Sequence, residues 1–243
     1  LGIDRSTPNC AVYGEVGKYP IVHRVYKRMI AFWVNISEGK TSKLSSIMYR
    51  LIYRLHLDGS YDSPWLMCIK RILCNSGNPN FWSEQELLSP KYFMKNVVAI
   101  QLENQFVQEW EFEVHRNRKC VTYRIFKDEI KFEPYLIKLD FVNRRALCKF
   151  RTGNHKLPVA KSRYISGGGG EEVKCMLCDT NDLCDEFHVL FICKYFNEHR
   201  KKYLKINYYS KPSTLKMYTL FNSKGNQRVN LARFVRCIIF FVS

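Results

Sequence analysis

Four residues whose side chains bind metal ions occur close together in the last third of the chain. Cys175 and Cys178 are separated by two residues, and His188 and Cys193 are separated by four. Two short pairs of thiolate and imidazole ligands around a loop are typical of tetrahedral structural zinc sites. The spacing therefore predicts one Zn²⁺ ion with four protein ligands, which leaves no open position for a catalytic water.

Other interpretations of these residues remain open. Cys184 and His199 lie close enough in the sequence to replace one of the four ligands. The cysteines could also be reduced and buried beside an unrelated histidine, or form a redox dithiol, although such dithiols usually open a helix after a strand. We expect the metal site, because residues 179–185 have almost no apolar side chains and metal binding would supply the missing folding free energy.

Lysines and arginines follow the cysteine cluster with almost no opposing carboxylates. We expect the nearest of them to contact nucleic-acid phosphates: Lys194, Arg200, Lys201, Lys202 and Lys205. The whole chain has 39 Lys and Arg against 22 Asp and Glu, a formal charge of +17 that a polyanion would offset. Aromatic residues between the cations could stack on unpaired bases, although core packing accounts for most such residues. The predicted partner is RNA or single-stranded DNA, although net charge alone specifies no ligand.

No catalytic constellation accompanies the cluster. The sequence contains no adjacent aspartate pair of the kind that holds two metal ions in a polymerase. Residues 14–18 resemble a phosphate-binding loop, but the glycine spacing is too short and Tyr19 stands where Ser or Thr would contact Mg²⁺. His155 follows a helical pattern, where a structural histidine is more common than a base. We expect no enzyme and no small-molecule substrate.

The remaining cysteines and the hydropathy indicate an intracellular protein. The cysteines outside the cluster are scattered, without the pattern of a disulfide framework, in a chain large enough to fold without one. No apolar run approaches the roughly 18 residues of a membrane span, and Arg233 and Arg236 interrupt the apolar C-terminal segment. We expect a nuclear protein that does not bind a membrane, and no feature predicts its oligomeric state.

Helical periodicity dominates the first half of the chain. Apolar residues recur at helical spacing over 26–33, before Gly39, which can take the left-handed conformation that ends a helix. Residues 44–55 carry a stronger apolar stripe, with Thr41 or Ser42 placed to cap it. We expect these two helices to form a helical hairpin.

Further helices are predicted along the chain. Ser63-Pro64 and Ser89-Pro90 each place a cap before a proline, and the second opens a helix that runs to about Arg116. Residues 120–126 alternate as a strand does but could equally form a short helix. After the cluster we expect a basic helix over 195–205 and an amphipathic one that carries Leu231, Val235, Ile238 and Val242.

A longer motif surrounds the predicted ligands. Residues 185–193 read Asp-Glu-Phe-His-Val-Leu-Phe-Ile-Cys, and residues 150–158 read Phe-Arg-Thr-Gly-Asn-His-Lys-Leu-Pro. Residues 6–20 contain Ser-Thr-Pro-Asn and then Tyr-Gly-Glu-Val-Gly-Lys-Tyr-Pro. Together with Cys175 and Cys178, these stretches resemble the region after the polymerase in non-LTR (LINE-type) retrotransposon reverse transcriptases, including its CCHC zinc-binding segment.

The resemblance implies the C-terminal region of a retrotransposon polyprotein, with endonuclease and polymerase upstream. This region would help to hold element RNA or target DNA. The paired metal-binding aspartates of the family have no counterpart in these residues, so the resemblance does not transfer polymerase activity to them. The four glycines at 167–170 also differ from the more polar stretch expected before the cysteines.

We therefore predict a mainly α protein, with a helical domain followed by a small zinc-binding module with flanking helices. The predicted parts are a connector at 1–22, a helical domain at 23–150, and a zinc-binding module with basic C-terminal helices at 151–243, with a flexible joint at 167–170. Two alternatives are a piece of an active RNA-directed DNA polymerase that functions only with its upstream domains, and a helical module that binds another protein. A genomic relic without function is a third.

Overall fold

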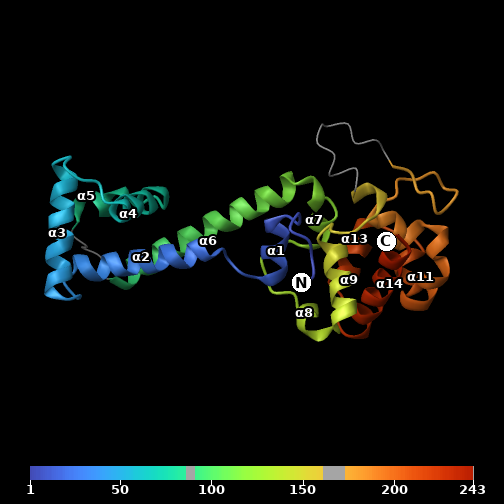
Figure 1. Cartoon of the computed structure of the whole chain (residues 1–243). Helices are drawn as coiled ribbons and strands as arrows, with labels where there is room; N and C mark the ends of the chain where they lie inside the picture. The colour runs from blue at the N-terminus through green and yellow to red at the C-terminus, as the bar shows by residue number, and fades with distance from the viewer. Residues whose placement is uncertain (86–90, 161–172, 243) are drawn as a thin grey trace. The chain divides into compact units, whose positions relative to one another are not determined.

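The computed structural model describes residues 1–85, 91–160 and 173–242, and this part of the chain is mainly helical (Figure 1). Within it, the β-structure is limited to an isolated bridge between Lys174 and Leu183. The predicted cap at Ser89-Pro90 and the glycines at 167–170 lie outside the described residues. None of the helices in the described ranges combines the length and hydropathy needed to cross a membrane.

The chain divides into two compact units, which are described separately. Unit 1 combines Leu1–Lys18 with Trp110–Ser243, and unit 2 is Tyr19–Glu109. These limits differ from the predicted boundaries at residues 22 and 150. In particular, the stretch predicted as a connector belongs to the same unit as the cysteine cluster.

Unit 2 holds four helices and most of a fifth. They are α2 (Ile21–Ser37), α3 (Lys43–Leu57), α4 (Pro64–Asn75), α5 (Pro79–Glu84) and the larger part of α6 (Lys91–Arg116). Gly39 follows α2 with a φ of 67°, and the Ser42 side chain accepts a hydrogen bond from the Ser45 backbone N–H at the start of α3. Both features were predicted from residue type, because each depends only on local backbone chemistry.

The apolar stripe of α3 faces outward, although the helix itself forms as predicted. Four of its side chains are 46–69% exposed: Leu44, Ile47, Met48 and Leu51. The opposite side is buried through Tyr49, whose hydroxyl accepts a hydrogen bond from the Trp33 indole at 2.8 Å. Figure 1 shows α3 crossing the end of α2 rather than running back along it, so the pair is not the expected hairpin.

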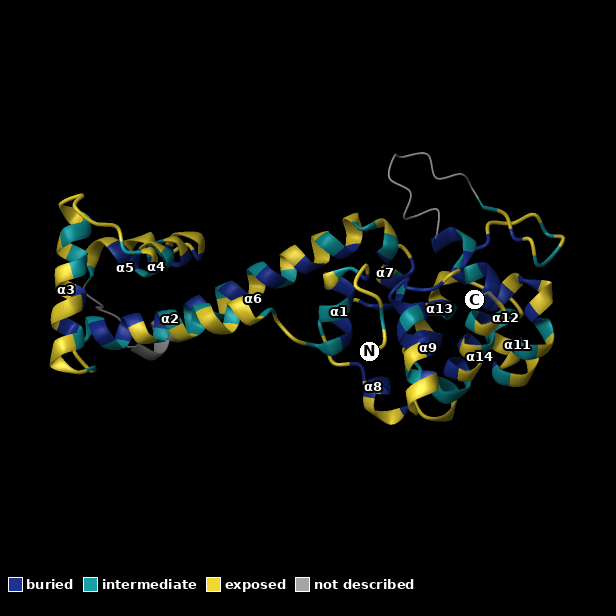
Figure 2. Ribbon diagram, viewed as in Figure 1, coloured by how far each residue is buried: buried dark blue, intermediate teal, exposed yellow. Residues whose placement is uncertain are grey.

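Unit 1 is built from short helices around a longer pair. Before the cysteine cluster come α1 (Asn9–Val16), the end of α6, η1 (Arg118–Cys120), α7 (Tyr123–Phe126), α8 (Tyr135–Lys138) and α9 (Phe141–Arg151). After it come η2 (His188–Ile192), η3 (Lys194–Phe196), α11 (Asn197–Tyr203), α12 (Ile206–Tyr209), α13 (Thr214–Phe221) and α14 (Asn226–Val242). Helices α9 and α14 lie side by side (Figure 1), and buried residues line both (Figure 2).

Two sequence expectations are resolved by packing within unit 1. Residues 120–126 are helical rather than extended, because Tyr123 and Phe126, three residues apart on one helical face, are both buried. The amphipathic pattern on the last helix is confirmed over its described side chains, since Leu231, Val235 and Ile238 are fully buried.

Residues 1–18 are held in unit 1 by buried polar contacts. Glu15 and Arg151 form an ion pair in which both side chains are at most 1% exposed, with Nη2 and Oε1 2.9 Å apart. The Trp110 indole donates to the Cys10 carbonyl at 2.7 Å. A carboxylate this deep requires its counter-ion, so α1 and α9 share one core.

Candidate metal centre

The first two candidate ligands lie on a short loop closed by an antiparallel bridge. The Cys175 N–H donates to the Asp182 carbonyl at 2.8 Å, beside the bridge between Lys174 and Leu183. Asn181 turns the chain with a φ of 60°, a left-handed conformation that Asn tolerates. The sequence showed the cysteine pair but not the bridge that supports it.

The other two candidate ligands lie at the ends of one wide turn. Residues 188–192 form a π-helical turn, η2, and the Cys193 N–H donates to the His188 carbonyl at 2.8 Å. Asp185 begins the turn by accepting a hydrogen bond from the His188 N–H at 2.7 Å. Single π turns are rare in proteins as a whole, but those that occur are often found at functional sites. Here the turn places His188 and Cys193 on the same side of the backbone.

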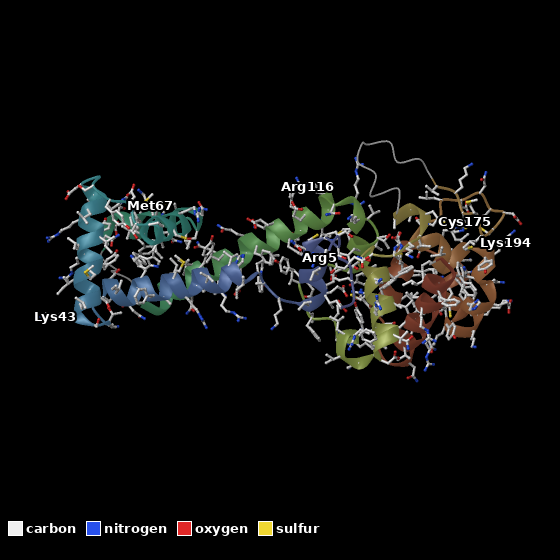
Figure 3. The ribbon with its side chains drawn as sticks, viewed as in Figure 1. Arg5, Lys43, Met67, Arg116, Cys175 and Lys194 are labelled. Atoms are coloured by element: carbon white, nitrogen blue, oxygen red, sulfur yellow. The ribbon has the colours of Figure 1, made fainter. Side chains whose placement is uncertain are left out.

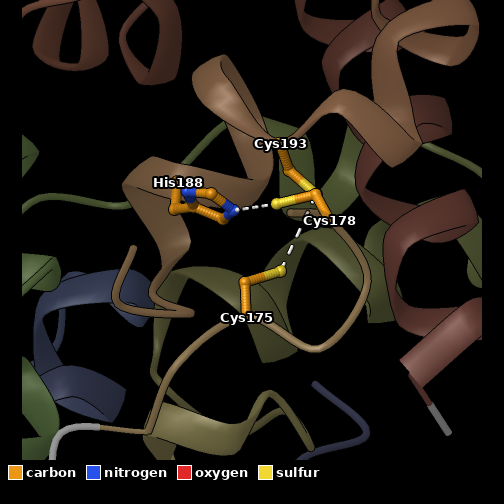
Figure 4. Close-up of side chains that lie close together, drawn as sticks. All are labelled: Cys175, Cys178, His188 and Cys193. Atoms are coloured by element: carbon orange, nitrogen blue, oxygen red, sulfur yellow. Dashed lines mark hydrogen bonds between the residues drawn. The ribbon is translucent and has the colours of Figure 1, made fainter. Parts of the chain in front are cut away.

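The four side chains point toward one another (Figure 4). Their ligand atoms all lie within 4.8 Å of one another. Cys175 Sγ and Cys193 Sγ are 3.9 Å apart, and Cys178 Sγ is 3.3 Å from His188 Nε2. A tetrahedral zinc site has Zn–S and Zn–N distances of about 2.3 and 2.0 Å, which require S–S and S–N separations of about 3.8 and 3.5 Å. The cluster can therefore hold a metal ion with three sulfur ligands and one nitrogen.

The thiols of the cluster differ in acidity. Burial raises the pKa of Cys193 to about 12. Burial also disfavours the Cys178 thiolate, but hydrogen bonds with Thr180, Cys175 and His188 outweigh it and lower the Cys178 pKa to about 6. Metals bind the thiolate form of cysteine. Cys178 is therefore already mostly a thiolate at neutral pH, whereas Cys193 must lose its proton when a metal binds.

A carboxylate lies behind the histidine. Asp182 Oδ2 is 3.6 Å from His188 Nδ1, on the side of the ring away from Cys178. This separation is longer than a hydrogen bond, and His188 Nδ1 has no hydrogen-bond partner among the described residues. Asp182 therefore places a negative charge near the candidate site without holding the His188 ring.

Neither alternative ligand belongs to the four-residue cluster. The His199 ring packs against Phe241, with ring centroids 5.5 Å apart. Cys184 is buried beside Cys175, and burial raises its pKa to about 12. The described geometry therefore favours the predicted set of Cys175, Cys178, His188 and Cys193.

Arg200 does not occupy the position expected of a phosphate contact. Its side chain is buried, with the residue 3% exposed, and its guanidinium donates to the carbonyls of Leu190 at 2.7 Å and Cys193 at 2.9 Å. Burial lowers its pKa, but a guanidinium stays charged. We correct the prediction: Arg200 stabilises the turn that carries the ligands, because its donors are committed to backbone carbonyls.

The four other predicted cations are exposed and follow the cluster in the sequence. They come from η3, from α11 and from the residue before α12: Lys194 (labelled in Figure 3), Lys201, Lys202 and Lys205. Lys201 Nζ lies 2.9 Å from Glu198 in an exposed ion pair, which costs little to separate. These lysines can reach a polyanion.

A second buried network, which the sequence did not reveal, lies beside the cluster. Glu186, two residues before His188, is fully buried, accepts a hydrogen bond from Thr122 at 2.8 Å and lies 2.9 Å from His155 Nε2. The Leu157 N–H donates to the other ring nitrogen of His155 at 3.4 Å. His155 is therefore a structural histidine, as expected. The only signal in the sequence was a carboxylate next to an apolar run.

The stretches that carry the family resemblance meet in this part of unit 1. The Thr7 hydroxyl donates to the side-chain amide oxygen of Asn154, Glu15 pairs with Arg151, and His155 contacts Glu186. We compared the chain with models of known protein families, with curated proteins and with solved structures. No significant similarity was found. The likeness to retrotransposon reverse transcriptases thus rests on the motif residues.

Proposed function

We propose that this chain is a zinc-stabilised, non-catalytic nucleic-acid-binding region of a non-LTR retrotransposon reverse transcriptase, one that holds element RNA or target DNA. The observation that carries the proposal is the convergence of three thiols and one imidazole within 4.8 Å. Soft sulfur ligands in a tetrahedral arrangement favour Zn²⁺ over the harder cations Mg²⁺ and Ca²⁺. Four protein ligands complete the shell, so the ion has a structural role.

The charge around the cluster supports nucleic acid as the partner. No Asp or Glu follows Glu198 in the sequence, whereas lysines and arginines continue to Arg236. The exposed lysines of η3 and α11 lie next to the metal ligands in sequence, and the turn that carries those ligands is fixed by Arg200. Such a surface binds phosphates and releases counterions, which makes the affinity fall as salt rises.

The family assignment is supported by the buried contacts among the motif residues. Glu15, Arg151, His155 and Glu186 are at most 8% exposed; Glu15 forms an ion pair with Arg151, and the His155 ring lies at hydrogen-bond distance from Glu186. The alternative, a piece of an active RNA-directed DNA polymerase, predicts an open reading frame with a palm aspartate pair upstream of Leu1, and sequencing the transcript would test it.

The test of binding is a salt series with the zinc-loaded chain. Fluorescence anisotropy with labelled single-stranded RNA and DNA should show affinity that falls by orders of magnitude between about 50 and 200 mM salt. The variant Lys201→Gln/Lys202→Gln should weaken binding and flatten the salt dependence. The matched variant Lys40→Gln/Lys43→Gln, on exposed lysines of unit 2, should do so less. No binding at low salt, or an affinity independent of salt, would refute the proposal.

One observation favours a second function for unit 2, the binding of a protein helix. At helical spacing, Lys43 (labelled in Figure 3), Arg50 and Arg54 lie next to Ile47 and Leu51 of the exposed apolar stripe, and α3 contains no Asp or Glu. Charge complementarity favours an amphipathic helix with acidic flanks over a second copy of this basic surface. A partner retained by the wild-type chain and lost with Leu51→Glu would support this function, and a chain that retains none would argue against it.

A further inference from the structure

A groove lies between α9 and α14 in unit 1, away from the predicted phosphate contacts in sequence. It has a volume of about 280 Å³, and the residues that line it include Phe141, Val142, Arg145, Lys149, Arg236 and Phe240. The two helices lie side by side (Figure 1) and bury Leu147 and Ile238 in the core. The walls are therefore parts of a packed structure rather than of a loop.

The groove exposes two aromatic rings. Phe141 is 61% exposed and Phe240 is 78% exposed. The guanidinium of Arg144 stacks over the Phe141 ring at 5.6 Å while donating to the Leu136 carbonyl at 3.1 Å, which fixes one side of the ring. Single exposed apolar side chains are common, but Phe141, Val142 and Phe240 line one groove together, and contiguous apolar patches often mark binding sites.

Phe241, the residue after Phe240, packs against other aromatic rings of unit 1, whereas Phe240 is the more exposed of the two. Phe241 packs edge-on against Tyr195 at 5.7 Å and His199 at 5.5 Å, and it also contacts Phe196. These rings directly follow the ligand Cys193 in the chain, in η3 and α11. The last turns of α14 are thus anchored to the segment after the metal cluster, and Phe240 lines the groove instead.

Cations, and no carboxylates, complete the groove. Arg145 and Arg236 are exposed and Lys149 is half-buried, and none of the described residues that line the groove is acidic. Arg145 uses Nε to donate to the Gly2 carbonyl at 3.3 Å, and a guanidinium has four further N–H donors. The groove therefore joins apolar ring faces to three positive charges.

This combination selects the kind of ligand. Phe141 and Phe240 on its walls are each more than half exposed, so the groove is open at the surface and can take part of a longer ligand. Bases in a duplex are stacked on one another, whereas unpaired bases stack on aromatic side chains while cations follow the backbone. Anionic lipid surfaces also bind exposed rings beside cations, so vesicles of anionic lipid belong in the test.

We propose that the groove between α9 and α14 binds an unpaired stretch of RNA or DNA. A base stacks on Phe240, and the neighbouring phosphates contact Arg145, Lys149 and Arg236. The inference rests on the proposed nucleic-acid-binding function and adds a second contact region to it, one that distinguishes single strands from duplexes. The exposed lysines after Cys193 supply charge, and the groove supplies base contacts.

The test uses the full zinc-loaded chain with fluorescein-labelled oligo(U) and oligo(dT) of about 12 nucleotides, close to the site sizes of single-strand binders. Phe240→Ala should weaken binding about 5- to 160-fold, the range for loss of one stacked base. Phe240→Trp should keep the wild-type affinity or raise it. Phe112→Ala is the matched control, because Phe112 is a 62% exposed phenylalanine of unit 1 outside the groove, and it should change binding less than about twofold.

The outcomes separate the two proposals. If the wild-type chain binds both oligonucleotides and Phe240→Ala binds them equally well, the groove proposal is wrong while the proposed function stands. If the wild-type chain binds neither, both are wrong. If Phe240→Ala weakens binding to a duplex as much as binding to the single strands, base stacking is also wrong. The same holds if Phe240→Ala weakens binding to vesicles of anionic lipid but not binding to the oligonucleotides. Oligo(U) and oligo(dT) compared with each other show whether the groove prefers RNA or DNA.

Discussion

The guanidinium of Arg200 donates a hydrogen bond to the backbone carbonyl of Cys193, at 2.9 Å. The same side chain donates to the Leu190 carbonyl at 2.7 Å, so α11 holds the turn that connects His188 to Cys193. A basic residue that the sequence predicted as a phosphate contact therefore supports the turn that carries the candidate ligands His188 and Cys193. Lys201 and Lys202 follow Arg200 in α11. The contact between Arg200 and the Cys193 carbonyl therefore links their position to the geometry of the cluster.

Removing this contact should weaken both folding and metal binding. Arg200→Met leaves buried carbonyls without donors, and we expect a loss of about 2–4 kcal/mol in the free energy of unfolding. Zinc affinity should fall about 10- to 100-fold, as for other residues that orient metal ligands. Thermal unfolding and competition with a chelator measure the two effects. Lys201→Met, on an exposed neighbour, should change neither, and equal behaviour of the two variants would contradict this role of Arg200.

Loss of one ligand should remove the metal. Elemental analysis of the purified chain should give about one zinc per chain, and Cys178→Ser should bring this close to zero, because three ligands cannot close a structural site. Cys74→Ser changes an exposed cysteine outside the cluster and should keep the zinc. Zinc retained in Cys178→Ser would show that Cys184 or another residue completes the ligand set.

Metal binding should release protons at neutral pH. Burial raises the pKa of Cys193 to about 12, so its thiol is protonated before the metal binds and must ionise to become a ligand. Protons therefore compete with the metal, and the apparent affinity should fall as the pH is lowered. Calorimetric titration in two buffers of different ionisation enthalpy measures the release. The same heat in both buffers would contradict this prediction.

The features that the sequence predicted are those set by neighbouring residues. The cap at Ser42, the left-handed Gly39 and the paired ligand spacing around Cys175 and His188 each depend on a few consecutive positions. The helical character of the chain follows from periodicity in the same way. The sequence of residues 120–126 alone could not distinguish a helix from a strand, because its alternation of apolar and polar residues fits a strand as well.

The features that the sequence did not predict depend on contacts between distant residues. Arg200 lies in a basic stretch and has the residue type of a surface cation. Only the folded structure shows that its guanidinium donates to the carbonyl of Leu190, ten positions earlier in the chain. Glu15 lies in a stretch rich in turn residues, and its partner Arg151 is 136 positions away. The stretch was therefore predicted as a connector, although a buried ion pair joins it to α9.

The buried ion pair between Glu15 and Arg151 should be essential to unit 1. Arg151→Met leaves Glu15 and Glu133 without their shared counter-ion, and we expect a loss of about 3–5 kcal/mol in the free energy of unfolding. Urea denaturation followed by circular dichroism measures it. Lys131→Met removes an exposed ion pair with Glu129 and should cost less than about 1 kcal/mol.

A double variant gives the control for this pair. Glu15→Gln combined with Arg151→Met removes charge of both signs, so it should be less destabilised than the sum of the two single variants. Strict additivity would mean that the two side chains do not interact in the folded chain.

The most direct test of the account is whether zinc and nucleic acid binding are coupled. The account predicts that the zinc-loaded chain binds single-stranded RNA at low salt, and that removal of zinc with a chelator weakens this binding at least about tenfold, because the lysines after Cys193 lose their support. Restoring zinc should restore the affinity. An RNA affinity that is the same with and without zinc, measured by anisotropy on one preparation, would contradict the claim that the metal centre organises the binding surface.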